Sequence, residues 1–99
     1  METDKIYRGY TWRVGIRLAE EMSAEGIGVC LYDQVSRRCY SGVLEETTDD
    51  GELVWLWSGA YTQEMVPGVY DLEVSQGTEL LLQQSSFVRV VRTGEADGR

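Results

Sequence analysis

One stretch, residues 53–74 (LVWLWSGAYTQEMVPGVYDLEV), constrains the fold more than any other part of the chain. Residues 53–58 have the pattern of a strand, and residues 62–66 fit one short helical turn with Thr62 as its cap. Pro67-Gly68 ends that turn, and residues 68–74 alternate as a second strand. A strand, a corner and a strand in this order are typical of the connection between the two sheets of a β-sandwich.

Most of the remaining chain alternates between apolar and polar residues, as half-buried antiparallel strands do. The segments are residues 11–18, 27–33, 39–46, 78–84 and 86–92, with a kink between the last two and a short edge strand at residues 6–8. Residues 19–26 are too few and too polar for a stable amphipathic helix, so we expect a loop there. The sequence predicts an all-β fold, an immunoglobulin-like antiparallel β-sandwich of about seven to eight short strands with one helical turn near residues 62–66. A small closed barrel is the structural alternative.

The chain has the size of one domain, with 99 residues of which 42% are hydrophobic. We expect a single domain over residues 1–99, with flexible tails at residues 1–5 and 93–99. The first residues contain no apolar segment of signal-peptide length, and no run approaches the roughly 20 apolar residues that span a bilayer. These features predict a soluble protein made in the cytoplasm.

The net charge of −8 bears on the choice of partner. An acidic domain repels phosphate backbones and anionic lipid, so we expect neither nucleic acid nor a membrane as partner. Part of the charge lies in the acidic turn at residues 45–52, EETTDDGE. Its oxygens could bind Ca²⁺, but the turn lacks EF-hand spacing, and we interpret it as a solvated rim without a metal.

The chain contains no His, the side chain most used for proton transfer at neutral pH. Ser-His-Asp and Cys-His catalysis are therefore excluded within this chain. The carboxylates present have no evident nucleophile and orienting partner. We predict no enzymatic activity, no catalytic residues and no cofactor.

The two cysteines, Cys30 and Cys39, are too few for a disulfide scaffold. A tight turn centred near residues 36–37 would place Cys39 opposite Gln34, and Cys30 opposite Val43. This register separates the two Cα atoms beyond the roughly 7 Å limit for a disulfide. The sequence predicts two free, partly buried thiols; a reactive thiol is the less favoured reading because neither Cys has a His partner.

The strand at residues 53–57 is apolar on both faces, which predicts either a central strand covered on both sides or one face in contact with a partner. Leu53, Trp55 and Trp57 share one face, and with Tyr61 they form the candidate protein interface. Three interpretations of the Trp pair stay open: core packing, a protein contact, or a stacking platform for a sugar.

Three motifs carry a resemblance to a known family: Y-R-G-x-T-W at residues 7–12, G-x-L-x-W-x-W-S at residues 51–58 and T-x-x-M-x-P-G-x-Y-D-L-E-V at residues 62–74. Together they resemble small bacteriophage and prophage sandwich domains, such as the N-terminal domain of phage baseplate upper proteins and stand-alone tail-associated proteins. The chain departs from that pattern at Tyr10, where the family usually has an acidic residue.

The resemblance implies a non-enzymatic structural or adaptor protein of a phage or prophage-like particle, which acts by docking to other protein subunits. A homo-oligomer is among the expected assemblies. The alternative function is a carbohydrate-binding β-sandwich module that uses Trp55 and Trp57.

Overall fold

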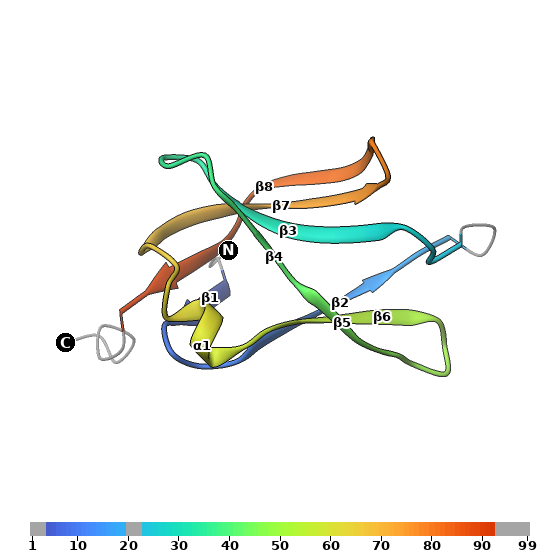
Figure 1. The fold of residues 1–99 in the computed structure, drawn as a ribbon, viewed down its shortest axis with the longest axis horizontal. Helices are drawn as coiled ribbons and strands as arrows, with labels where there is room; N and C mark the ends of the chain where they lie inside the picture. The colour runs from blue at the N-terminus through green and yellow to red at the C-terminus, as the bar shows by residue number, and fades with distance from the viewer. Residues whose placement is uncertain (1–3, 20–22, 93–99) are drawn as a thin grey trace.

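A computed structural model describes residues 4–19 and 23–92 and shows two packed β-sheets, so the predicted all-β class is confirmed (Figure 1). The elements, in chain order, are β1 (Asp4–Tyr7), β2 (Trp12–Arg17), β3 (Ile27–Asp33), β4 (Cys39–Ser41), β5 (Val43–Thr47), β6 (Glu52–Trp57), α1 (Gly59–Thr62), β7 (Gly68–Gln76) and β8 (Glu79–Val91). The predicted loop at residues 19–26 includes residues 20–22, and the predicted tails include residues 1–3 and 93–99, all outside the described residues. Asp4 and Lys5, also predicted as tail, belong to β1.

The strands of one sheet follow the order β1-β8-β7-β3-β4, and those of the other follow β2-β6-β5. All neighbouring strands are antiparallel except β1 and β8, which are parallel and form an exception at this edge to the predicted antiparallel sandwich. A hairpin forces two strands to be antiparallel. No hairpin joins β1 to β8, because the chain leaves β1 for β2 in the other sheet. The immunoglobulin-like layout of the strands stays a prediction.

The predicted single strand at residues 39–46 is two strands that belong to different sheets. β4 pairs with β3, and β5 pairs with β6, so the chain crosses between the sheets at Gly42. A Cβ atom on Gly42 would lie 2.7 Å from Cη2 of the Trp57 ring. The crossing therefore needs a residue without a side chain at this position.

The core lies between the two sheets and is built from the inward-facing residues of the alternating strands. Its members are Ile6, Val29, Leu31, Tyr40, Leu53, Trp55, Trp57, Met65, Tyr70, Leu72, Val74, Val88 and Val90. Strand β2 adds Trp12, Val14 and Ile16 from its inner face, as its alternation predicts. Burial of these side chains is the main term that holds the two sheets together.

The single helical turn comes earlier than predicted. It covers Gly59–Thr62 rather than residues 62–66, and Ser58 is its N-cap, since the Ser58 hydroxyl accepts a hydrogen bond from the Tyr61 amide at 3.2 Å. Thr62, predicted as the cap, is buried, and its hydroxyl donates to the Tyr10 carbonyl at 2.9 Å. The same hydroxyl accepts from the Gly9 amide at 3.1 Å. Thr62 thus fastens the corner to the segment between β1 and β2.

The kink predicted between two last strands is a bulge within one strand, β8. The pairing of β7 with β8 shifts between Tyr70–Val88 and Leu72–Gln84. Ser86, within the bulge, has a left-handed φ of 53°. The buried Asp71 carboxylate accepts a hydrogen bond from the Ser86 amide at 2.9 Å, so a side chain of β7 satisfies the backbone where the ladder is interrupted.

Candidate functional site

The candidate protein interface on β6 is not a surface of this fold. Leu53, Trp55 and Trp57 are 2%, 5% and 0% exposed, because this face of β6 packs against the five-stranded sheet. Tyr61 is half-buried, and its ring lies 5.8 Å from that of Tyr40. The prediction of an interface made of these residues is therefore corrected: the Trp strand belongs to the core.

The same burial removes the stacking platform on which the carbohydrate alternative depended. A sugar ring needs an open aromatic face, and the rings of Trp55 and Trp57 are enclosed between the sheets. The Trp57 indole N–H donates to the Tyr40 carbonyl at 2.8 Å, and the ring of Trp12 packs 5.3 Å from that of Trp57. These contacts are those of a core residue.

The other apolar face of β6, which points away from the core, is covered by an ion pair between the two neighbouring strands. β6 lies between β2 and β5, and the Arg13 guanidinium on β2 forms a two-point ion pair with the Glu45 carboxylate on β5, at 2.7 and 3.1 Å. Because it joins the two flanking strands, this pair crosses β6, where Val54 and Leu56 are half-buried. The pair lowers the pKa of Glu45, through the hydrogen bond and the charge of Arg13. The doubly apolar strand is thus explained by a central position with both sides covered.

A surface that could bind a partner is found on β8 rather than on β6, because part of the backbone of β8 has no neighbouring strand. β1 pairs only with Val88–Val91, so no described strand lies beside the outer edge of β8 from Glu79 to Phe87. Leu80 and Leu82 in this part are 55% and 45% exposed. Figure 1 shows the hairpin of β7 and β8 extending away from the three-stranded sheet. This part of β8 is called the free edge below.

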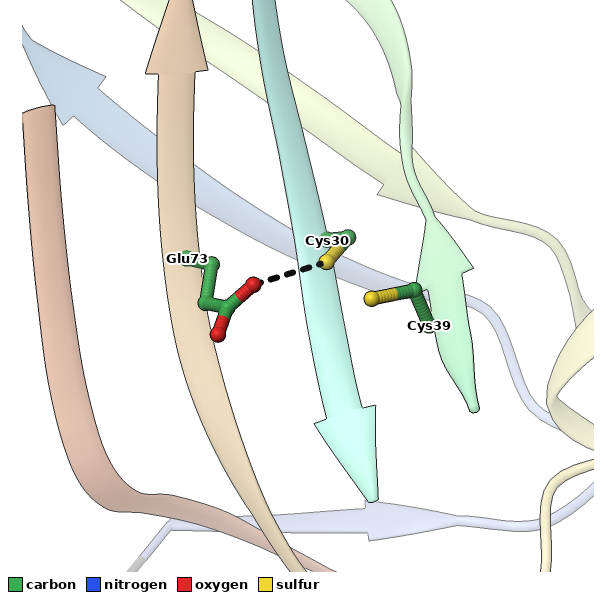
Figure 2. A group of neighbouring side chains, drawn as sticks. All are labelled: Cys30, Cys39 and Glu73. Carbon is green, nitrogen blue, oxygen red and sulfur yellow. Dashed lines mark hydrogen bonds between the residues drawn. The ribbon is translucent and has the colours of Figure 1, made fainter. Parts of the chain in front are cut away.

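A second feature, on the outer face of the five-stranded sheet, is a cluster of three side chains from three adjacent strands: Cys30 of β3, Cys39 of β4 and Glu73 of β7 (Figure 2). Cys30 is directly opposite Glu73 in the ladder, and its Sγ–H donates to Glu73 Oε1 at 3.8 Å. Cys39 is opposite Tyr32, so it is the diagonal neighbour of Cys30 on the same face. One ligand atom from each residue lies within 4.8 Å of the other two.

The cluster borders a hollow of about 320 Å³. Its lining residues are Gly28, Val29, Cys30, Cys39, Ser41, Gly42, Glu73 and Ser75. Gly28, which lies on the same face of β3 as Cys30, contributes no side chain, which leaves room above the sheet at this point. Cys30 and Glu73 are half-buried at its side, and Cys39 is exposed, so the cluster is accessible from solvent.

The electrostatics of the cluster disfavour a nucleophilic thiol. Burial raises the pKa of Cys30, and the neighbouring Cys39 thiol and Glu73 carboxylate raise it further. A thiolate is the nucleophilic form of Cys, and a raised pKa keeps the proton on sulfur at neutral pH. The two thiols are free in the structure, as the sequence predicted, although Cys39 is exposed rather than partly buried.

Sequence reasoning did not find this cluster because its hairpin register was wrong by two residues. The hairpin closes where the Asp33 amide donates a hydrogen bond of 2.9 Å to the Arg38 carbonyl, and it places Cys30 opposite Ser41 rather than Val43. Arg37 adopts a left-handed φ of 64°, which Arg does not signal in a sequence. The position of Glu73 beside Cys30 depends on a third strand, for which the sequence carries no local sign.

The carboxylates of the acidic turn, residues 45–52, do not form a group that could bind a metal ion. Among the described residues, Cys30, Cys39 and Glu73 are the one group of three potential ligands within metal-binding distance. Asp50 instead pairs with Arg17 at 2.8 Å and accepts a hydrogen bond from the Thr48 hydroxyl. In the described part of the chain, no helix has the length and the apolar character that crossing a membrane requires.

Comparisons with protein-family models, with curated proteins and with solved structures found no match to this chain. The function is therefore argued from the free edge and from the cluster on the outer face of the five-stranded sheet.

Proposed function

We propose that this chain is a non-enzymatic structural or adaptor subunit that acts by docking to other protein subunits, and that its first partner is a second copy of itself. The observation that carries the proposal is the free edge of β8, where no described strand pairs with Glu79–Phe87. An unpaired strand edge presents a row of N–H and C=O groups that another strand can complete.

The composition of the free edge supports association rather than avoidance of it. Natural edge strands are usually protected by Lys, Pro, inward-pointing charges or bulges, and the protection present on β8 is its bulge near Ser86. Glu79, at the start of the free edge, is its one charged residue, and residues 80–87 (LLLQQSSF) contain neither a charged residue nor Pro, although 26% of the chain is charged. Leu80 and Leu82 also offer exposed apolar area beside the open backbone.

The distribution of charge supports a second copy as the occupant. In an antiparallel pair of β8 strands centred on Leu82, the two Glu79 carboxylates lie at opposite ends, about 20 Å apart. That separation exceeds the Debye length of about 8 Å at physiological ionic strength. The uncharged middle of one edge therefore meets the uncharged middle of the other. Such a pair is two-fold symmetric and joins two five-stranded sheets into one.

The corner motif at residues 62–74 supports a phage or prophage-like particle as the setting, through the resemblance described above. Particles of this kind are assembled from many copies of small subunits, and a subunit that pairs with itself would serve as such a building block.

Light scattering over a range of concentrations tests the proposal on the full chain, with Leu82→Lys beside the parent. The matched control is Val35→Lys, which adds the same charge at a side chain that is 93% exposed in the turn between β3 and β4. We expect a parent dimer that Leu82→Lys dissociates and Val35→Lys leaves intact, with circular dichroism showing that both variants stay folded. A monomeric parent, or a dimer equally insensitive to both substitutions, would exclude pairing through the free edge.

A further inference from the structure

The cluster of Cys30, Cys39 and Glu73 assembles two sulfur atoms and a carboxylate at one point of the outer sheet face (Figure 2). We propose that it is a binding site for a borderline-soft divalent cation of the Zn²⁺ type, with these three side chains as ligands and one coordination position open to the hollow. Binding of the ion displaces the protons of the two thiols, which are released to solvent. The site is independent of the free edge, and nothing in the docking proposal depends on it.

The ligand chemistry selects the class of ion. Hard cations such as Ca²⁺ and Mg²⁺ take oxygen ligands, whereas Zn²⁺ accepts thiolate sulfur together with carboxylate oxygen. With a Zn–S distance of about 2.3 Å and a Zn–O distance of about 2.1 Å, ligand atoms around a tetrahedral ion lie roughly 3.5–3.8 Å apart. Cys30 Sγ and Glu73 Oε1 are 3.8 Å apart, and all three ligand atoms lie within 4.8 Å of one another. Small side-chain rotations bring the set to tetrahedral spacing.

The strand register favours a bridging ion over a disulfide. Diagonal neighbours in an antiparallel pair have Cα atoms about 7–8 Å apart. A disulfide requires Cα atoms no more than about 6.8 Å apart without a shift of the backbone. Cys30 and Cys39 occupy such a diagonal, and both are free thiols in the structure. An ion between the sulfur atoms spans the distance that a direct bond does not.

The surroundings of Glu73 hold one of its oxygens toward the thiols. Gln83 Nε2 donates to Glu73 Oε2 at 3.4 Å, while Oε1 accepts from Cys30. Outer hydrogen bonds of this kind orient ligating carboxylates in metal sites. The ion pairs between described side chains join Arg13 to Glu45 and Arg17 to Asp50, so neither neutralises Glu73.

The hollow determines what kind of site this is. Three protein ligands and an open fourth position are typical of zinc sites that exchange a water or a further ligand, whereas structural sites are closed by four protein ligands. The hydroxyl groups of Ser41 and Ser75 line the same hollow and provide polar partners for a water on the ion.

Titration of Zn²⁺ into the reduced full chain, in competition with a chromophoric chelator, tests the site. Co²⁺ serves as a second probe, because its absorption spectrum reports tetrahedral geometry and bound thiolate. We expect one ion per chain and a cobalt–thiolate absorption. Absence of the thiolate absorption would overturn the proposal, because it would place the bound ion on surface carboxylates.

Substitution of the proposed ligands tests which side chains bind the ion. Cys39→Ser, at an exposed position, and Glu73→Gln should each lower the affinity for Zn²⁺ by at least about 10-fold, and Cys39→Ser should reduce the cobalt–thiolate absorption to that of the one remaining thiolate, Cys30. The matched control is Glu79→Gln, which removes the same charge from the same sheet and should leave the affinity unchanged. Unchanged affinity in Cys39→Ser or in Glu73→Gln, or an equal loss in Glu79→Gln, would overturn the three-ligand site. Circular dichroism of each variant confirms that the fold is retained.

Discussion

Trp57 and Tyr40 join the two sheets through a hydrogen bond, since the Trp57 indole N–H of β6 donates to the backbone carbonyl of Tyr40 in β4 at 2.8 Å. Both residues are buried, with 0% and 6% of their area exposed. The bond lies beside the point where the chain crosses from β4 to β5. It therefore fixes the relative position of the two sheets at their shared corner, inside the core where an unpaired donor or acceptor is costly.

Removal of the Trp57 indole N–H should destabilise the protein more than the same change at Trp55. The Trp55 indole N–H is also buried, but it has no hydrogen-bond partner within the described residues. Trp57→Phe and Trp55→Phe delete the same atoms, so their difference isolates the bond to Tyr40, for which we expect about 1–3 kcal/mol. Chemical denaturation measures it, and equal losses in the two variants would show that the bond contributes nothing.

Gly42→Ala should destabilise the fold by about 1–3 kcal/mol, because the new methyl group would overlap the Trp57 ring. Its Cβ would lie 2.7–3.0 Å from three ring carbons of Trp57. The matched control is Gly28→Ala, whose Cβ would meet no atom nearer than the Ser75 hydroxyl at 3.9 Å. The free energy of unfolding should be unchanged or slightly raised there. Partial rescue of Gly42→Ala by Trp57→Phe would confirm the ring as the cause.

Local alternation did not show that residues 39–46 belong to two strands or that residues 79–91 form one, but it was sufficient to predict which segments are extended. β2 shows why: Trp12, Val14 and Ile16 face the core while Arg13 and Arg17 face outward, as period-two patterning requires. The two apolar faces of β6 left two interpretations open, a central strand covered on both sides and a strand with one face in contact with a partner. That both faces are covered could not be deduced, because the ion pair of Arg13 and Glu45 that covers the outer face comes from the strands on either side.

The errors arose where a distant segment decides the local structure. Ser58 and Thr62 are both good cap residues, and Thr62 is excluded from that role by its contacts with Gly9 and Tyr10, about fifty residues away along the chain. The candidate metal cluster depends on a hairpin register set by the left-handed Arg37 and on a third strand that brings Glu73 beside Cys30. No periodicity in the sequence encodes these relationships.

Asp71→Ala should cost about 1–3 kcal/mol of stability, because it removes two part-buried hydrogen bonds to a charged acceptor. The Asp71 carboxylate, in a residue only 6% exposed, accepts from the Ser86 amide at 2.9 Å and from Gln34 Nε2 at 2.7 Å. Protection against amide hydrogen exchange should be lost first at the β8 bulge. The control is Asp33→Ala, at another buried Asp of the same sheet. If Asp71→Ala left the exchange protection at Ser86 unaffected, that result would contradict the role given to the Asp71 carboxylate.

Acid should weaken the turn between β5 and β6 within a defined pH range. Hydrogen bonds from Thr48 and then Arg17, together with the charge of Arg17, lower the pKa of Asp50 to about 2 from its ordinary value of 3.8. A pKa depressed in the folded state adds stability that is complete above the unfolded value and is lost as the pH falls through the folded value. The contribution of Asp50 is therefore lost between about pH 4 and pH 2.

Asp50→Asn should make the free energy of unfolding less dependent on pH across that range, since the variant has no carboxylate to protonate at this position. The same substitution at the adjacent Asp49 removes an equal charge from the turn and is the control. Urea denaturation at a series of pH values measures both. Parallel pH profiles for the parent and Asp50→Asn would show that the hydrogen bonds to Asp50 do not persist in solution.

Added salt should strengthen the dimer formed through the free edge of β8. Each copy carries a net charge of −8, so two copies repel one another, while residues 80–87, which form most of that edge, contain no charged side chain. Salt shortens the Debye length from about 30 Å at 0.01 M to about 3 Å at 1 M, which screens the repulsion and leaves the uncharged contact unaffected. Sedimentation equilibrium over this range should show the dissociation constant falling several-fold as salt is added. A dissociation constant that rises with salt would instead indicate ion pairs across the interface, and would place the contact away from this uncharged edge.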